Sequence, residues 1–216
     1  MKHTYTVIGL GVFGSTIALE LSRLGNDVIG IDLNPNLVND IADRITQAVI
    51  ADARDEKVLR DLGVHECDGV VVAIGEDIEA NILATLIVKG MPRPQVWAKA
   101  LNPNHHKILE KLGSDHIVHP EHEMGLRLAR SMVYPEVMDY ISFGDDQFTV
   151  EVRASERLAG QNIDALHLPE NGLQCLLIKH LNQVMAPPPQ QYEFKLNDKI
   201  LLWGTLGNLR KITKYL

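Results

Sequence analysis

The chain has 216 residues, enough for one or two domains that each bury a hydrophobic core. Its 28 acidic and 21 basic side chains give a net charge of −7, which argues against a nucleic-acid partner because such binding depends on neutralising phosphates. Its two cysteines form no CxxC pair, no apolar run approaches the roughly 20 residues of a membrane span, and no signal peptide precedes the first strand, so we expect a cytoplasmic protein.

The first predicted strand, residues 4–8, is apolar and runs directly into a turn with the pattern G-x-G-x-x-G. In a dinucleotide-binding fold, the first glycine permits a tight turn and the second lets the backbone approach a pyrophosphate. The third lets the following helix pack close to the strand, and the N–H groups at the start of that helix are available to an anion. The pattern alone is weak evidence, since it also fits an ordinary glycine-rich turn. Its glycines are Gly9, Gly11 and Gly14.

A second strand, residues 27–32, follows the helix and ends on Asp32. A carboxylate at this position accepts hydrogen bonds from both ribose hydroxyls of a nucleotide, and its charge repels a 2′-phosphate. Strand, turn, helix, second strand and acid all stand at the spacing of a dinucleotide-binding unit. The sequence therefore predicts a site for NAD, ATP, ADP or AMP rather than for NADP.

Helices and strands continue to alternate as far as residue 133. Asn34 and Asn102, each followed by proline, are expected to cap helices, and so is Asp77. The first and fourth strands are near-continuous apolar runs, which is typical of a parallel sheet covered by helices on both faces. The sequence thus predicts a Rossmann-like, doubly wound α/β domain over residues 1–134. Its further strands are expected at 48–52, 69–74, 96–100 and 116–119, and its further helices at 35–45, 55–62, 77–89, 103–112 and 121–133.

The remainder of the chain changes character and predicts a small α+β domain over residues 143–216, after a linker at 135–142. Asp145 and Asp146 are expected in a solvated turn, and the proline run 187–189 in a stiff loop or edge segment. Because roughly 75 residues make a thin core, we expect dimerisation to stabilise this domain. Its strands are expected at 148–152, 175–179 and 199–203, and its helices at 157–166 and 206–215.

Histidines gather near the end of the first domain and raise the question of a transition-metal site, since imidazole and carboxylate ligate zinc. His116 and His119 are expected on opposite faces of a strand, and no helical H-x-x-x-H supports them, so zinc is disfavoured. His105 and His106 are interpreted as surface residues. Trp97 and Trp203 are interpreted as core residues.

Several segments, taken in chain order, resemble sequences of the KtrA/TrkA family. Its members are the cytosolic regulators of conductance of potassium (RCK) that gate bacterial potassium transporters and channels. The sequence His-Pro-Glu at 119–121, followed by Met124 and Gly125, is especially similar to the KtrA branch. The region after residue 140 resembles the small C-terminal domain of the same family. Only the first glycine motif is shared widely with dehydrogenases. The matching segments are 7–14, 30–32, 72–75, 96–100 and 117–121.

The resemblance implies a regulatory subunit without catalysis that binds an adenine nucleotide: ATP, ADP or NAD/NADH. It implies a homodimer that assembles into an octameric ring, peripheral on the cytosolic face of the membrane, against a potassium-transporting subunit of the KtrB or TrkH type. From the charge balance, no nucleic-acid partner is expected. Carried over to this sequence, the implied nucleotide-binding residues are Gly9, Gly11, Val12, Phe13, Gly14, Asp32, Leu33, Asp52, Ala53, Ala73, Ile74, Gly75 and Lys99.

Three further points follow from the resemblance. Glu121 matches the acid that helps to hold a divalent cation, Mg or Ca, at the nucleotide phosphates. Val12 departs from close KtrA relatives, which carry an arginine directed at the terminal phosphates, so we expect weaker discrimination of ATP from ADP or NADH. Some relatives bind cyclic di-AMP in the C-terminal domain, but the loop 167–170 lacks the basic residue of those binders.

The alternative function is an NAD-dependent oxidoreductase. Such an enzyme needs a proton donor and an anion clamp beside the nicotinamide. The sequence offers no Ser/Tyr/Lys set and no Cys–His pair placed for that purpose.

Overall fold

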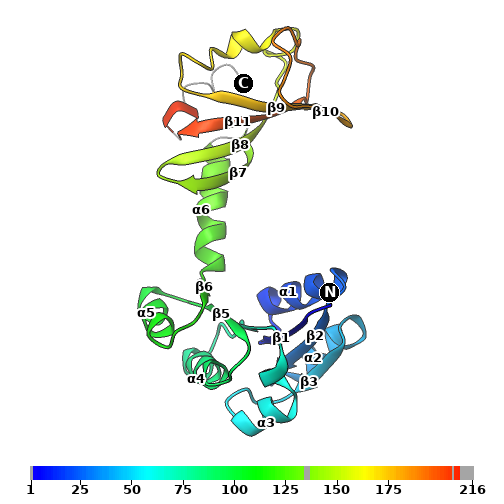
Figure 1. The fold of residues 1–216 in the computed structure, drawn as a ribbon, viewed down its shortest axis with the longest axis vertical. Coiled ribbons are helices and arrows are strands. Elements are labelled where there is room, and N and C mark those ends of the chain that lie inside the picture. The colour runs from blue at the N-terminus through cyan, green and yellow to red at the C-terminus, as the bar shows by residue number, and fades with distance from the viewer. Residues whose placement is uncertain (1, 134–136, 206, 210–216) are drawn as a thin grey trace. The chain divides into compact units, whose positions relative to one another are not determined.

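The computed structural model describes residues 2–133, 137–205 and 207–209. The chain forms two compact units, Met1–Glu123 and Met124–Leu216 (Figure 1). Within the described residues, no helix is both long and apolar enough to cross a membrane.

The first unit is built on a parallel sheet of six strands in the order β3-β2-β1-β4-β5-β6. β1 is central and pairs with both β2 and β4, so the chain reverses its winding direction between β1 and β4. The strands are β1 (Thr4–Ile8), β2 (Asp27–Asp32), β3 (Gln47–Ile50), β4 (Gly69–Val72), β5 (Gln95–Lys99) and β6 (His116–Val118).

Helices cover both faces of this sheet, as the apolar strands predict. Adjacent residues of one strand point to opposite faces, and they belong to separate hydrophobic clusters: Ile8 packs in one cluster and Val7 in the other. The predicted doubly wound fold is therefore confirmed. The helices of the unit are α1 (Val12–Arg23), α2 (Pro35–Ile41), α3 (Glu56–Asp61), α4 (Ile78–Lys89) and α5 (Pro103–Lys111), with short 3₁₀ helices η1 (Ala42–Arg44) and η2 (Val64–Glu66); α6 (Pro120–Val133) follows β6.

The predicted helix caps are confirmed. The side chain of Asn34 accepts a hydrogen bond from an N–H in the first turn of α2, and Asn102 does the same for α5. The Asp77 carboxylate accepts from the N–H of Ala80 at 2.9 Å and caps α4. These caps fix where the loops that follow β2, β4 and β5 end.

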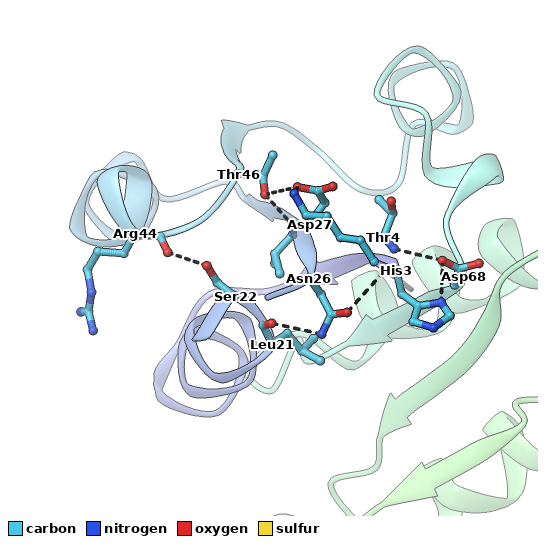
Figure 2. A network of polar contacts seen from close by, with 11 residues as sticks. His3, Thr4, Leu21, Ser22, Asn26, Asp27, Arg44, Thr46 and Asp68 are labelled. Carbon is cyan, nitrogen blue, oxygen red and sulfur yellow. Dashed lines mark hydrogen bonds and ion pairs between the residues drawn. The ribbon is translucent and has the colours of Figure 1, made fainter. Parts of the chain in front are cut away.

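A polar network ties together the amino ends of the strands (Figure 2). Asp68 accepts from the N–H of Thr4, and Asn26 accepts from the N–H of His3. The hydroxyl of Thr46 donates to Asp27 at 3.1 Å. These contacts satisfy backbone groups at the edge of the sheet remote from the glycine turn, so we assign the network a structural role.

The second unit contains an antiparallel sheet of five strands in the order β10-β9-β11-β8-β7. One face of β8, β9 and β11 is packed against the loops that connect the strands, and Phe194 is buried in that cluster. The strands are β7 (Val137–Gly144), β8 (Gln147–Arg153), β9 (Gln174–His180), β10 (Gln183–Met185) and β11 (Lys199–Thr205), and a 3₁₀ helix, η3, spans Ile163–Leu166.

The structure differs from the sequence-based predictions mainly in this second unit. Residues 137–142, expected in a linker, belong to β7, which forms a hairpin with β8. The turn of that hairpin is the predicted acidic turn, in which Asp145 and Asp146 take φ values of 48° and 58°, the left-handed backbone of a two-residue hairpin loop. β10 was not expected. The predicted helix at 206–215 falls mostly outside the described residues, of which 207–209 are helical.

The helix predicted over residues 157–166 is also wrong. Leu158 and Leu166 are both buried, and their spacing imitates a helical face. Gly160, however, adopts a φ of 81°, and Asn162 caps a new turn by accepting from the N–H of Asp164. Residues 157–160 therefore form turns, and the 3₁₀ helix η3 is the only helical part of this segment. Trp203, expected in the core, is 39% exposed because it faces away from the cluster that holds its neighbour Leu202.

Asp198 organises the loop that precedes β11. Its carboxylate is buried and accepts hydrogen bonds from the His180 ring (2.6 Å), the Tyr192 hydroxyl (2.8 Å) and the N–H of Lys195 (2.8 Å). Burial and the contact with Asp198 raise the pKa of Tyr192 to about 12.

The variant Asp198→Asn is expected to destabilise the second unit by about 1–3 kcal/mol, because an amide presents N–H groups where the site supplies only donors. Urea unfolding in a Trp97→Phe background, followed by Trp203 fluorescence, measures this effect. Asp145→Asn, in the exposed hairpin turn, is the control and should leave the unfolding midpoint in place. Equal midpoints for the two variants would contradict the assignment.

Candidate functional site

The glycine turn lies at the carboxyl end of β1, and its three glycines have three different environments. Gly9 adopts a φ of 92°, and a Cβ at this position would lie 2.8 Å from the backbone nitrogen of Ile74. A Cβ on Gly14 would lie 1.8 Å from the carbonyl oxygen of Gly9. A Cβ on Gly11 would meet no atom within 4 Å. Gly9 and Gly14 are thus required by packing, whereas Gly11 faces open space.

The helix that follows the turn presents its first N–H groups without competition from the protein. Gly11 is the N-cap of α1 and supplies no side-chain cap, and the first turn of α1 contains no acidic residue. Val12 is 89% exposed and Gly11 is exposed too, so the very start of the helix is open to a ligand. The first N–H groups of a helix lack intrahelical partners and favour an anion. This arrangement fits a phosphate group.

Asp32, at the end of β2, is held against the glycine turn. One carboxylate oxygen accepts from the N–H of Leu10 at 2.6 Å, and the other accepts from the N–H of Asn34 at 2.8 Å. Each carboxylate oxygen accepts two hydrogen bonds, so acceptor capacity remains for two ribose hydroxyls. The neighbouring Leu33 is exposed beside this carboxylate.

Asp52 and Ala53 follow β3 at the same edge of the sheet. Asp52 forms a bidentate ion pair with Arg54, with the shortest N–O distance 2.7 Å, and this pair lowers the pKa of the Asp52 carboxyl. The hydrogen bond to Asp52 likewise raises the pKa of Arg54, and the carboxylates of Asp77 and Glu79, at the start of α4, add a smaller contribution. The sequence analysis did not single out Arg54, because an acid and an arginine two residues apart do not by themselves predict a bidentate ion pair.

The ends of β4 and β5 are joined by a buried asparagine that the sequence analysis also missed. The side-chain amide of Asn81 donates to the carbonyl oxygens of Ile74 (2.8 Å) and Lys99 (3.2 Å). This bridge fixes the backbone of the segment Ala73, Ile74 and Gly75, the predicted pocket wall. Ala73 is buried in the cluster that contains α1.

Lys99, the last residue of β5, is a buried cation at this edge. Its ammonium lies 2.5 Å from a carboxylate oxygen of Glu121 and 5.8 Å from the centre of the Phe13 ring. A Cβ on Gly75 would lie 2.9 Å from the same nitrogen, so glycine leaves room for the lysine. The contact with Lys99 lowers the pKa of the Glu121 carboxyl.

The predicted nucleotide-binding residues therefore come from the carboxyl ends of the first five strands and from the first turn of α1. In an open parallel sheet, ligands bind at this edge, at the point where the strand order reverses. That point lies between β1 and β4. Binding by these residues remains a prediction, and their placement is what such a site requires.

The histidine interpretation needs one correction. His105 is buried rather than on the surface, and burial lowers the pKa of its ring. His106 stacks on His119, with 2.8 Å between a nitrogen of each ring, and Trp97 stacks on His116. Within the described part of the chain, no three histidine, cysteine or acidic side chains converge as a metal site.

Comparisons with known proteins identify relatives of this chain. The family model of the TrkA-N domain matches residues 5–120. The Ktr system potassium uptake protein A of Bacillus subtilis (strain 168) is 38% identical over 208 residues, which cover 96% of this chain and 94% of that protein. Protein C of the same system and organism is 38% identical over 215 residues, which cover 99% and 97%.

Among solved structures, the GsuK channel bound to NAD is similar with a TM-score of 0.64 and 16% sequence identity. The match covers 99% of this chain and 40% of that chain, so this chain spans less than half of the channel polypeptide. This likeness concerns the fold. The family model and the two Ktr relatives extend over most of the sequence, and on that evidence the chain belongs to the KtrA/TrkA family of potassium uptake proteins.

Proposed function

We propose that the chain is a nucleotide-sensing regulatory subunit of a potassium uptake system and acts without catalysis. The observation that carries this proposal is the open Gly11 turn, with the Asp32 carboxylate fixed beside it, in a member of a potassium uptake family. The ligand is an adenine nucleotide: ATP, ADP or NAD/NADH. The nucleotide-binding residues are those predicted from the sequence, and Arg54 lies next to them.

Regulation by such a site is a matter of linkage. A nucleotide that binds one conformation of the subunit more tightly than another shifts the equilibrium between them by that difference, typically ~1–3 kcal/mol for each coupled site. α6 begins two residues after β6 and includes Glu121, the partner of Lys99. We propose α6 as the element through which occupancy of the site is transmitted.

The subunit is proposed to act as a homodimer, four of which form an octameric ring, on the cytosolic side of a KtrB- or TrkH-like membrane subunit. The names of its relatives as potassium uptake proteins support the membrane partner. Apolar side chains left exposed along α6 support association with a second copy, since contiguous exposed apolar surface marks interaction sites. They are Met124, Leu126, Leu128, Met132 and Val133.

A divalent cation, Mg or Ca, is proposed to enter with the nucleotide. Glu121 supplies one carboxylate, and these ions prefer oxygen ligands. No group of three potential ligands converges among the described residues, and we expect the nucleotide phosphates and water to supply further oxygens. Retention of the cation should therefore depend on nucleotide, which equilibrium dialysis of Ca with and without ADP tests.

Two measurements test the proposal. Titration calorimetry with ATP, ADP, AMP, NADH and NADPH is expected to show binding of adenine nucleotides and much weaker binding of NADPH. Potassium flux into vesicles that contain the membrane subunit and this chain is expected to change on addition of the bound nucleotide. Failure of every adenine nucleotide to bind or to raise the unfolding temperature would contradict the proposal.

Val12→Arg is expected to raise ATP affinity by about ten- to a hundredfold, the value of a charge-assisted contact of ~1.5–3 kcal/mol. Val12 is almost fully exposed at the first position of α1, so an arginine fits without repacking. AMP affinity should change little, because AMP has no terminal phosphates to reach. Val12→Met is the control for side-chain length. A wild-type preference for ATP over ADP already above a hundredfold would contradict the weakened discrimination inferred from Val12.

A further inference from the structure

We propose that the Lys99–Glu121 ion pair is a latch that the nucleotide opens: a bound phosphate takes the Lys99 ammonium from Glu121 and so releases the start of α6. This inference rests on the proposed function and adds to it the contact that couples the site to α6.

Because Lys99 is buried, its ammonium depends on a nearby negative charge. The Lys99 side chain is 9% exposed, whereas the Glu121 side chain is 68% exposed. A buried cation has lost most of its water and needs a counter-charge. Glu121 supplies that charge from the first turn of α6, and the Phe13 ring faces the ammonium from α1. The lysine is thus fixed within the sheet edge, and the glutamate is the movable partner.

The ammonium of Lys99 lies where a phosphate would compete for it. Phe13 is the second residue of α1, whose N-cap is Gly11. Gly75 lies in the loop after β4, the strand that pairs with β1 on the other side of the switch point. α1 offers no closer cation of its own, since its basic residue is Arg23 in the last turn and position 12 is valine. A dianionic phosphate group at the turn is a stronger counter-charge for Lys99 than one largely hydrated carboxylate.

Glu121 occupies a position from which its release is transmitted. It is the second residue of α6, and the N–H of Glu123 bonds to the carbonyl oxygen of His119 at 2.9 Å in the same turn. Loss of the Lys99 contact removes an anchor between this turn and β5. It also frees the Glu121 carboxylate at the moment when a nucleotide arrives.

The latch predicts that a substitution next to the site strengthens nucleotide binding instead of weakening it. Since binding has to break the ion pair, removing the charge of Glu121 should tighten ADP binding in the absence of divalent cations. We expect Glu121→Gln to bind ADP about two- to fivefold more tightly than the wild type in EDTA, the range of an ion pair with one exposed partner. The matched control is Glu123→Gln, which removes the same charge two residues away on an exposed side chain outside the pair. It should leave the ADP affinity unchanged.

A double-mutant cycle separates the latch from the general field of the carboxylate. Lys99→Met keeps the apolar stem and should weaken ADP binding at least about tenfold. In that background, Glu121→Gln should have no further effect, because there is no pair left to break. Equal tightening with and without Lys99, or no tightening in the wild-type background, would overturn the latch while leaving the proposed function intact.

Amide hydrogen exchange supplies a second readout. ADP in EDTA is expected to speed exchange at the start of α6 in the wild type, where the Glu123 N–H reports on the first turn, and to have no such effect in Glu121→Gln. Slower or unchanged exchange in the wild type on ADP binding would overturn the latch. Absence of ADP binding by the wild type and by all variants would instead overturn the proposed function.

Discussion

Replacing Gly11 with alanine is expected to weaken adenine-nucleotide binding by about tenfold or more while leaving the stability of the ligand-free protein unchanged. Its φ of −59° suits alanine, and the added methyl group would meet no protein atom within 4 Å. The space that the methyl group enters is the one assigned to the phosphates. Calorimetry with ADP measures the affinity, and thermal unfolding without ligand measures the stability.

Gly14→Ala is the contrasting variant of the same motif. Its methyl group would collide with the backbone of Gly9, so we expect a loss of more than about 3 kcal/mol in unfolding free energy, beyond the usual cost of overpacking. Gly25→Ala is the comparison: Gly25 has a φ of 87° and nothing within 4 Å of an added Cβ. Its loss in unfolding free energy therefore measures backbone strain without a steric collision. A Gly11→Ala protein that binds ADP as well as the wild type would contradict the phosphate assignment.

Asp32→Ala is expected to reduce the affinity for adenine nucleotides by about a hundredfold or more. Two ribose hydroxyls would lose a charged acceptor, each worth ~1.5–3 kcal/mol, and the N–H of Leu10 in the turn would lose its partner. Asp32→Asn keeps one side-chain acceptor and removes the repulsion of a 2′-phosphate. Asp32→Asn should therefore reduce the difference in affinity between NADH and NADPH. A purely structural role of Asp32 would not produce this change.

The control for this prediction is Asp40→Ala, an exposed acid on α2. It should leave both affinities unchanged. Calorimetry of the three variants with ADP, NADH and NADPH makes the comparison. Asp32→Ala with wild-type affinity for all three ligands would contradict the ribose assignment.

The first unit could be predicted from the sequence because its signals are local. Caps such as Asn34 lie within three residues of the N–H groups that they accept from. The strands are indicated by short apolar runs. The second unit could not be predicted as well. Leu158 and Leu166 share a core without sharing a helix, because Gly160 reverses the chain between them. β7 was missed because its pairing with β8 is visible only once the hairpin is formed.

The candidate site divides in the same way. The glycines and Asp32 were predicted because a short pattern fixes both their identity and their spacing. The contacts of Asn81 and the Lys99–Glu121 pair bring together residues from different elements, the latter 22 positions apart. No periodicity of the sequence encodes those contacts. The sequence thus identifies where a nucleotide is expected, and the structure adds which side chains contact one another there.

The central position of β1 has a consequence for synthesis of the chain. β1 is synthesised before both of its partners: one of its edges pairs with β2 and the other with β4, which ends at Val72. Until Val72 has emerged, a nascent chain carries the glycine turn on a strand with one open edge, and open edges invite pairing with other chains. The proposed nucleotide site can therefore be completed only after β4 has paired with β1, although its glycines and Asp32 all lie within the first 32 residues of the sequence.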